Sequence, residues 1–306
     1  MVILGSRGSD LALWQARHVQ QLLATKAQVT SRIEIIKTAG DQRYDISLAR
    51  LEGKGFFTRE IEEALLEGRI DLAVHSHKDL PTESPAGLAV VAVPKRGPAA
   101  DCLVVCPEVW QEADGLPLRE GAVVGSGSTR RQAQLLFLRP DLTLRDLRGN
   151  VPTRLRKLAQ GEYDAIVLAE AGLKRLGLDL GNLRLHRLDC ETFVPAPAQG
   201  ALAIQMRAGD QQRAGDRALA AALDRLNDPV TARLVATERL LLASLEGGCH
   251  LPLGAHATIT PDEKIELLAT LGQPGGGLAR CRVTANSPEA AARDCLAGLN
   301  AEPMTS

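Results

Sequence analysis

The same local pattern opens two well-separated parts of the chain: a short apolar run, a turn rich in Gly and Ser, and then a helix. The first copy runs from Val2 to about Thr25 and turns at residues 5–9. The second copy runs from Val123 to Leu138 and turns at residues 125–128. Apolar strand runs that alternate with amphipathic helices are typical of α/β sheets. The sequence therefore predicts an α/β protein in which this pattern is used twice.

Two segments rich in Pro, Gly and Ala, residues 94–101 and 194–200, separate the strand-and-helix regions. Two such crossovers would let the chain leave a first domain and return to it. Helices dominate after residue 214, and three strand-like runs and a last helix indicate a small α+β third domain. We expect domain 1 over residues 1–95 and 200–220, domain 2 over 100–193, and domain 3 over 224–306.

The overall charge of the 306 residues is −1, and aromatic residues make up 3%. A neutral chain has no global field for nucleic acid or an anionic membrane, and scarce aromatics argue against base stacking. No apolar run approaches membrane-spanning length, and the start of the chain does not resemble a signal peptide. The six cysteines form no Cys-x-x-Cys pair. We expect a cytoplasmic monomer without a nucleic-acid or membrane partner.

The run from Asp71 to Pro81 (DLAVHSHKDLP) begins apolar and ends charged. Its apolar half predicts a buried strand, and ligands of open α/β sheets bind beyond the carboxyl ends of strands. Asp79 is therefore the first candidate for a working carboxylate, with Lys78 as its positive neighbour. The alternative is a strand that ends in a solvated turn. His75 and His77 would share a strand face, but no third ligand is evident, so we expect no metal.

The stretch from Gly125 to Arg175 carries a net charge of +5, from eight Arg and two Lys against five acidic residues. Arg130 and Arg131 open a predicted helix, where the helix dipole disfavours cations. This local cost indicates an anion site, because arginine matches the geometry of carboxylates and phosphates. The alternative is a solvated basic face.

Two loops complete the candidates. Residues 39–55 are charged and aperiodic, which is typical of a functional loop or of disorder. Cys249 follows Gly247 and Gly248, so its sulfur is either an accessible nucleophile or an inert loop thiol.

Eight motifs, in order along residues 2 to about 260, resemble the porphobilinogen deaminase family, also called hydroxymethylbilane synthases. They are RGS and LALWQA at 7–16, GKGFF at 53–57, HSHKDLP at 75–81, STRRQ at 128–132, LRGNV at 147–151, AGLKRL at 171–176, PAQG at 197–200 and EGGC at 246–249. Each motif is weak alone, and their order makes the resemblance specific.

The resemblance implies three domains, the first two folded like type-II periplasmic binding proteins with the active cleft between them. It implies a dipyrromethane cofactor, bound through a thioether to Cys249, and the condensation of four porphobilinogen molecules into hydroxymethylbilane. Asp79 matches the catalytic aspartate of the family. The positions that match cofactor, substrate or lid residues are Arg7, Ser9, Phe57, Lys78, Ser128, Arg130, Arg131, Arg148, Arg154, Arg175 and Gln199.

The chain departs from the family pattern at a few positions. His77 stands where an apolar residue is common, Arg50 where Lys is frequent, and His250 where Gln is frequent. The alternative function is a non-enzymatic solute-binding module, which the pair Lys78-Asp79 and the motif ending at Cys249 disfavour. A nucleic-acid binder is disfavoured by the net charge and the scarce aromatics.

Overall fold

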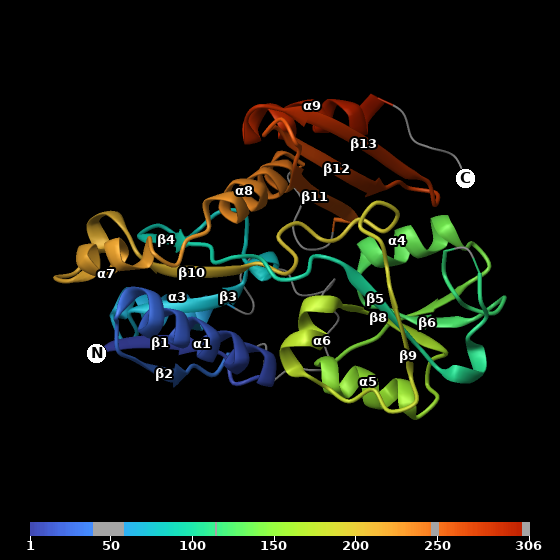
Figure 1. The fold of residues 1–306 in the computed structure, drawn as a ribbon, viewed down its shortest axis with the longest axis horizontal. Coiled ribbons are helices and arrows are strands. Elements are labelled where there is room, and N and C mark those ends of the chain that lie inside the picture. The colour runs from blue at the N-terminus through green and yellow to red at the C-terminus, as the bar shows by residue number, and fades with distance from the viewer. Residues whose placement is uncertain (39–57, 114, 246–250, 302–306) are drawn as a thin grey trace. The chain divides into compact units, whose positions relative to one another are not determined.

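The structure is a computed structural model that describes residues 1–38, 58–113, 115–245 and 251–301 (Figure 1). Contacts divide the chain into two compact units. Unit 1 contains Met1–Gly97 and Gly200–Arg233, and unit 2 contains Pro98–Gln199 and Leu234–Ser306. The first two changes of unit, after Gly97 and after Gln199, fall within the segments rich in Pro, Gly and Ala, and the third follows Arg233.

Unit 1 is built on a five-stranded mixed sheet in the order β2-β1-β3-β10-β4. β1 is parallel to β2 and β3, whereas β10 is antiparallel to β3 and β4. The strands are β1 (Val2–Ser6), β2 (Ser31–Ile35), β3 (Leu72–Ser76), β4 (Leu88–Ala92) and β10 (Leu202–Arg207). The helices are α1 (Asp10–Leu22), α3 (Arg59–Glu67) and α7 (Asp216–Leu223).

Successive side chains of β3 point to opposite faces of the sheet, so they pack against different helices. Leu72 and Val74 share one apolar cluster with side chains of α1 and α7. Ala73 belongs to the cluster that contains the apolar face of α3. The sheet is therefore covered on both faces, as a buried β3 requires.

Unit 2 contains a second five-stranded mixed sheet in the order β7-β6-β8-β5-β9. β6 is parallel to β7 and β8, and β5 is antiparallel to β8 and β9. The strands are β5 (Asp101–Val105), β6 (Val123–Gly125), β7 (Thr143–Arg145), β8 (Ala165–Ala169) and β9 (Arg184–Arg187). The helices are α4 (Thr129–Leu138), α5 (Val151–Ala159) and α6 (Glu170–Leu176). In each five-stranded sheet, the antiparallel strand is the one that follows a crossover.

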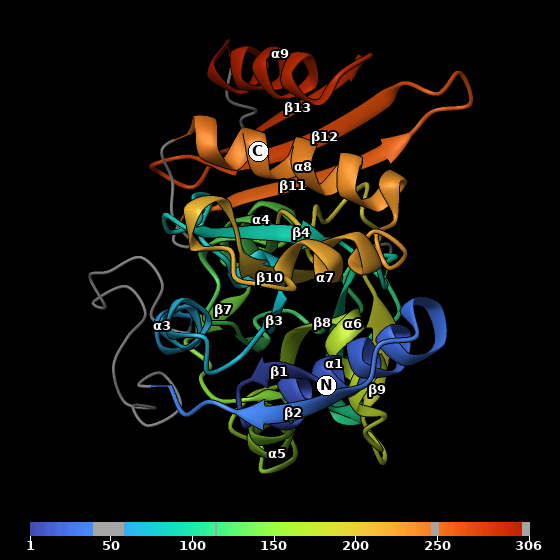
Figure 2. The same ribbon diagram turned by 90° about the vertical axis from the view of Figure 1, so that its left-hand side faces the viewer.

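A smaller antiparallel sheet, β11-β12-β13, also belongs to unit 2. Its strands are β11 (Leu253–Ile259), β12 (Ile265–Gly272) and β13 (Leu278–Ala285), and α9 (Pro288–Ala301) lies along it (Figure 2). Side chains of α9 and Leu241 of α8 (Pro229–Ser244) complete its apolar core. The expected α/β class and small third domain are thus confirmed, and both five-stranded sheets are mixed.

Several element boundaries differ from the sequence expectation. The first helix ends at Leu22, and a π-helical turn then covers Leu23–Ala27. Thr58 precedes α3 but makes no side-chain capping bond, since its hydroxyl bonds to Glu62 instead. β3 extends to Ser76, so His75 belongs to the strand and His77 to the turn that follows.

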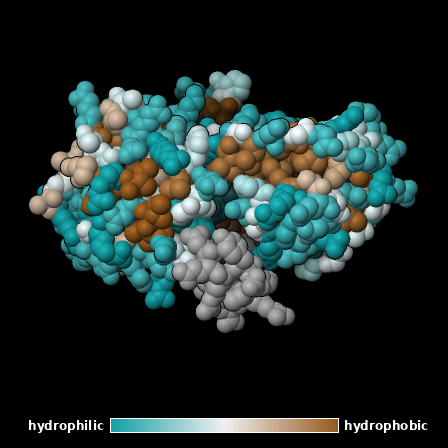
Figure 3. Space-filling model, turned by 90° about the horizontal axis from the view of Figure 1, so that it is seen from below, coloured by the Kyte–Doolittle hydropathy of each residue, from teal (hydrophilic) through white to brown (hydrophobic). Residues whose placement is uncertain are grey.

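The surface is mixed. Hydrophilic residues cover most of the face seen in Figure 3, and apolar residues gather in limited patches. Within the described ranges, no helix combines the length and the apolar character that crossing a membrane requires.

Candidate functional site

In unit 1, the candidate residues gather at one edge of the sheet. β1 and β3 are parallel neighbours, so their carboxyl ends lie at the same edge. Arg7 and Ser9 follow β1, and a short 3-10 turn, His77–Asp79, follows β3. The structure therefore brings Arg7, Ser9, Lys78 and Asp79 to a common edge.

Several hydrogen bonds fix this edge. The amide of Gln15 in α1 donates to the Ser76 hydroxyl at 2.8 Å, which ties the helix to the end of β3. The His77 backbone N–H donates to the Ala201 carbonyl at 3.0 Å, so the turn is held against the chain that enters β10. The Ser9 hydroxyl accepts from the Ala12 N–H at 3.4 Å, so Ser9 is the N-cap of α1.

Asp79 is exposed, and its carboxylate has no hydrogen bond or ion pair to any other residue that the structure describes. Lys78 beside it is half-buried. A carboxylate on a fixed turn without an internal partner is free to accept N–H bonds from a ligand or to stabilise positive charge.

His75 and His77 do not form the shared strand face that the sequence suggested, because β3 ends between them. Within the described ranges, no group of three His, Cys, Asp or Glu side chains is arranged to hold a metal ion. His75 is buried, and its Nε2 lies 3.1 Å from the Gln205 side-chain oxygen. Burial lowers the pKa of His75 to about 4, and the nearby Arg7 acts in the same direction.

In unit 2, the candidate residues follow the carboxyl ends of three parallel strands. Ser128 directly precedes α4 after β6, Arg148 follows β7, and Arg175 lies in α6 after β8. The Ser128 hydroxyl makes no capping bond and no other hydrogen bond among the described residues. A hydroxyl at a helix start lies at the positive end of the helix dipole, an arrangement that suits an anion.

Arg130 and Arg131 are buried rather than solvated, and both bind Asp101 at the start of β5. Asp101 is fully buried, forms an ion pair with Arg130 Nη2 at 2.8 Å, and accepts a hydrogen bond from Arg131 Nη2 at 2.7 Å. The Gln199 amide donates to the same carboxylate at 2.9 Å. Arg130 also donates to the Val194 carbonyl at 2.8 Å and Arg131 to the Val167 carbonyl at 2.9 Å. The two arginines are therefore held rigidly in a buried cluster with Asp101 and Gln199.

This buried cluster carries two guanidinium charges and one carboxylate, an excess of one positive charge. Burial lowers the pKa of Arg130, and the Asp101 carboxylate opposes that effect. The Nε atoms of Arg130 and Arg131 are buried and have no hydrogen-bond partner among the described residues. Uncompensated buried charge and unused donors both favour the approach of an anion.

The other arginines of the basic stretch differ in their surroundings. Arg148 donates from Nε to Asp146 at 2.9 Å, and Arg154 from Nε to the Gly149 carbonyl at 2.7 Å. Burial lowers the pKa of Arg175 to about 10. The alternative interpretation, a solvated basic face, therefore does not describe Arg130 and Arg131.

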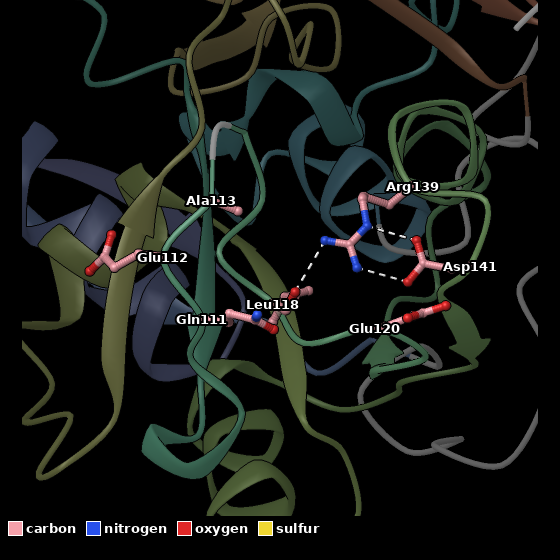
Figure 4. Close-up of a pocket in the computed structure, with 7 residues that line it drawn as sticks. All are labelled: Gln111, Glu112, Ala113, Leu118, Glu120, Arg139 and Asp141. Atoms are coloured by element: carbon pink, nitrogen blue, oxygen red, sulfur yellow. Dashed lines mark hydrogen bonds and ion pairs between the residues drawn. The ribbon is translucent and has the colours of Figure 1, made fainter.

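A surface pocket of about 380 Å³ in unit 2 contains none of the predicted site residues. Arg139 lines it, and Figure 4 shows this side chain in a double ion pair with Asp141, with both N···O distances 2.7 Å. Arg139 also donates to the Leu118 carbonyl at 3.1 Å. Its donors are thus engaged by the protein, and we assign the chemistry to the strand ends instead.

Two candidates, Phe57 and Cys249, lie outside the described residues, as does the expected functional loop at 39–55. The elements on either side of the Cys249 loop are described: α8 ends at Ser244 and β11 begins at Leu253.

Sequence reasoning missed Asp101, which lies at the boundary of a segment interpreted only as a crossover. The available signal was the run Asp101-Cys102-Leu103-Val104-Val105, because a carboxylate at the head of an apolar strand needs a cationic partner when it is buried. Sequence reasoning also missed the bond between His75 and Gln205, which lie 130 positions apart.

Comparisons with known proteins show the family to which the chain is similar. Residues 2–214 match the family model described as "Porphobilinogen deaminase, dipyromethane cofactor binding domain", and residues 232–302 match "Porphobilinogen deaminase, C-terminal domain". A porphobilinogen deaminase of Nitratidesulfovibrio vulgaris is 48% identical over 87% of this chain and 81% of its own. One from Bacillus cereus is 43% identical over 94% of this chain and 90% of its own. Among solved structures, a periplasmic substrate-binding protein of an ABC transporter from Coxiella burnetii aligns with a TM-score of 0.42 and 13% identity, over 78% of this chain and 97% of its own.

Proposed function

The chain belongs to the porphobilinogen deaminase family and is a transferase of tetrapyrrole biosynthesis, and we propose that Asp79 is its catalytic carboxylate. The reaction condenses four porphobilinogen molecules into hydroxymethylbilane and releases ammonia. The observation that carries the proposal is the exposed Asp79 on a fixed turn, without an ion pair among the described residues.

The proposed role of Asp79 follows from the charge that develops on the substrate. When the aminomethyl carbon of porphobilinogen loses ammonia, the pyrrole becomes electron-poor, and positive charge develops at its ring N–H. A fixed carboxylate that accepts this N–H bond stabilises the charge without reorganisation. The turn His77–Asp79 is anchored by the bond from His77 to Ala201, so its geometry is set before substrate binds.

We propose that the arginines of unit 2 hold the carboxylates of the growing chain. Each porphobilinogen carries an acetate and a propionate, so each step adds two negative charges that a nearly neutral protein must balance locally. The excess positive charge of Arg130, Arg131 and Asp101 and the two unused Nε–H donors support this role. The anion site of unit 2 would also include residues that follow the same strand ends, namely Ser128, Arg148, Arg154 and Arg175. In unit 1, carboxylates would be bound by Arg7, Ser9 and Lys78.

The matching family domain binds dipyrromethane, a group that also carries acetate and propionate side chains. The residues of the buried cluster fit such a group, because it would supply the anion that the cluster lacks. When bound, the group provides the pyrrole carbon to which the first substrate is joined. We propose Cys249 as its point of attachment, with Gln199 holding Asp101 behind the arginines and Phe57 shielding the reaction from water.

The variant Asp79→Ala tests the assignment of the catalytic carboxylate. Asp71→Ala is not a suitable control, because Asp71 pairs with Arg207 and accepts a hydrogen bond from the Ile3 backbone N–H. A better control is Asp10→Ala, an exposed carboxylate in the first turn of α1. We expect Asp79→Ala to carry the cofactor in its denatured mass while losing nearly all turnover of porphobilinogen, and Asp10→Ala to retain both. Normal turnover in Asp79→Ala would refute the catalytic role.

We also infer a monomeric, cytoplasmic enzyme without a nucleic-acid or membrane partner, supported by the net charge of −1 and the scarce aromatics. Light scattering behind size exclusion tests the first point. A mass of one chain, about 32.7 kDa, is expected, and a stable dimer would contradict it.

A further inference from the structure

We propose that His75 is a positioning residue, set in one tautomer by a buried relay of Thr58, Glu62 and Gln205, and that this relay fixes the end of β3 that carries Lys78 and Asp79. The inference rests on the proposed role of Asp79. His75 and the three residues of the relay come from three parts of unit 1: the start of α3, β3 and β10. All four are at least nine-tenths buried.

Strand register explains why the two sheet residues meet. Gln205 lies opposite Ala73, and Ala203 lies opposite His75. Gln205 and His75 are therefore diagonal neighbours on the sheet face that packs on α3. The surrounding cluster is apolar, with Ile61, Ala64 and Leu65 of α3 against Ala73. Polar side chains in such a layer are costly unless their hydrogen bonds are made.

The hydrogen bonds give the relay a direction. Glu62 accepts at one oxygen from the Thr58 hydroxyl at 3.2 Å and at the other from the Gln205 amide at 3.1 Å. An ionised carboxylate only accepts, so the Gln205 nitrogen must face Glu62 and its oxygen must face His75. The Gln205 oxygen then accepts from His75 Nε2, 3.1 Å away.

His75 is consequently the Nε2–H tautomer, with Nδ1 as an acceptor. Arg7, which follows the neighbouring strand β1, acts on His75 electrostatically, so a charged imidazole would be repelled at this position. The relay keeps the His75 ring neutral and in one orientation. The next residue, Ser76, accepts a hydrogen bond from Gln15 on the other face of the sheet. The end of β3 is thus fixed from both faces, and Lys78 and Asp79 follow directly.

Glu62→Gln tests the relay without changing its size. A glutamine at position 62 can donate or accept, so the orientation of the Gln205 amide and the tautomer of His75 are no longer determined. Glu63→Gln is the matched control, because Glu63 is the next residue of α3 and is exposed, paired only with Arg59 among the described residues. The double variant Glu62→Gln/Gln205→Glu restores an acceptor-only group beside His75 and is the expected rescue.

Two readouts are needed on the holoenzyme. Long-range ¹H–¹⁵N correlation spectra, assigned with His75→Gln, report the tautomer, and steady-state kinetics report turnover. We expect Glu62→Gln to mix the tautomers and to lower kcat about tenfold or more with little change in KM, a loss of about 1.4 kcal/mol in transition-state stabilisation. Glu63→Gln should change neither, and the double variant should recover both.

The relay is refuted if the wild-type ring is the Nδ1–H tautomer or is charged at pH 7. It is also refuted if Glu62→Gln mixes the tautomers yet keeps wild-type kcat, or if kcat falls equally in the single and double variants. The turnover of Asp79→Ala tests the proposed role of Asp79 independently of each of these results, so the two failures are distinguishable.

Discussion

Replacing Asp101 by Asn is expected to destabilise unit 2 strongly, although the two side chains have nearly the same size. Asp101 is fully buried, forms ion pairs with Arg131 and Arg130 at 2.7 and 2.8 Å, and accepts a hydrogen bond from Gln199 at 2.9 Å. Asparagine removes the only negative charge of this cluster and turns a donor toward other donors. Two buried guanidinium groups would then lack a carboxylate.

The magnitude follows from the cost of breaking a buried ion pair by removing one partner, about 3–5 kcal/mol. We place the loss from Asp101→Asn in this range and not above it, because Arg130 and Arg131 keep their bonds to the Val194 and Val167 carbonyls. The same change at Asp294, which forms an exposed pair with Arg293, is the control and should have little effect.

Urea unfolding measures the loss. Trp110 lies in unit 2 and Trp14 in unit 1, so a Trp14→Phe background makes fluorescence report on unit 2. We expect the transition of Asp101→Asn to move to lower urea with an unchanged slope, whereas Asp294→Asn stays near its parent. A loss below about 1 kcal/mol for Asp101→Asn would refute the view that this carboxylate compensates both arginines.

Three further outcomes are expected. Burial lowers the folded-state pKa of His75 from 6.5 to about 4, and Arg7 acts in the same direction, so between these pH values the unfolded chain binds a proton that the folded protein does not. The stability due to His75 is therefore complete above pH 6.5 and falls by about 3 kcal/mol toward pH 4. The free energy of unfolding in urea should depend less on pH for His75→Gln than for the wild type, and parallel curves would contradict this. Gly254→Ala would place a Cβ 2.7 Å from the Val194 carbonyl oxygen and should lower the free energy of unfolding by about 1–3 kcal/mol. In the control Gly172→Ala, the nearest neighbour of the new Cβ is Val151 at 3.7 Å, and no loss of stability is expected. Equal melting temperatures for the two variants would show that the close packing at β11 does not contribute to stability. Arg148→Leu should block cofactor assembly or chain growth, seen as a changed set of enzyme-bound masses, and an unaltered set of intermediates would count against its role in holding carboxylates.

The fold could largely be predicted from local patterns. The strand, Gly/Ser turn and helix at residues 2–25 and 123–138 appeared as expected, because apolar periodicity and capping residues such as Ser9 act over short distances. β5 and β9 were not predicted. Each is held by pairing within the second sheet, and the pairing that places Arg184–Arg187 beside β5 has no local sequence signal.

The candidate site was predictable in its residue types but not in its internal pairing. The sequence indicated that Arg130 and Arg131 bind anions, and the surprising feature is that the protein itself supplies one carboxylate, Asp101. Likewise the run at residues 75–79 indicated a functional turn, but Gln205, which orients His75, lies far away in the sequence. Contacts of this kind depend on sheet order, and sheet order cannot be read from neighbouring residues.

The intact mass of the denatured protein shows whether the chain carries a dipyrromethane on Cys249. We expect a mass above that of the printed sequence by one dipyrromethane, on a peptide that contains Cys249, and the loss of this addition in Cys249→Ser. A chain of unmodified mass that converts porphobilinogen at full rate would contradict it.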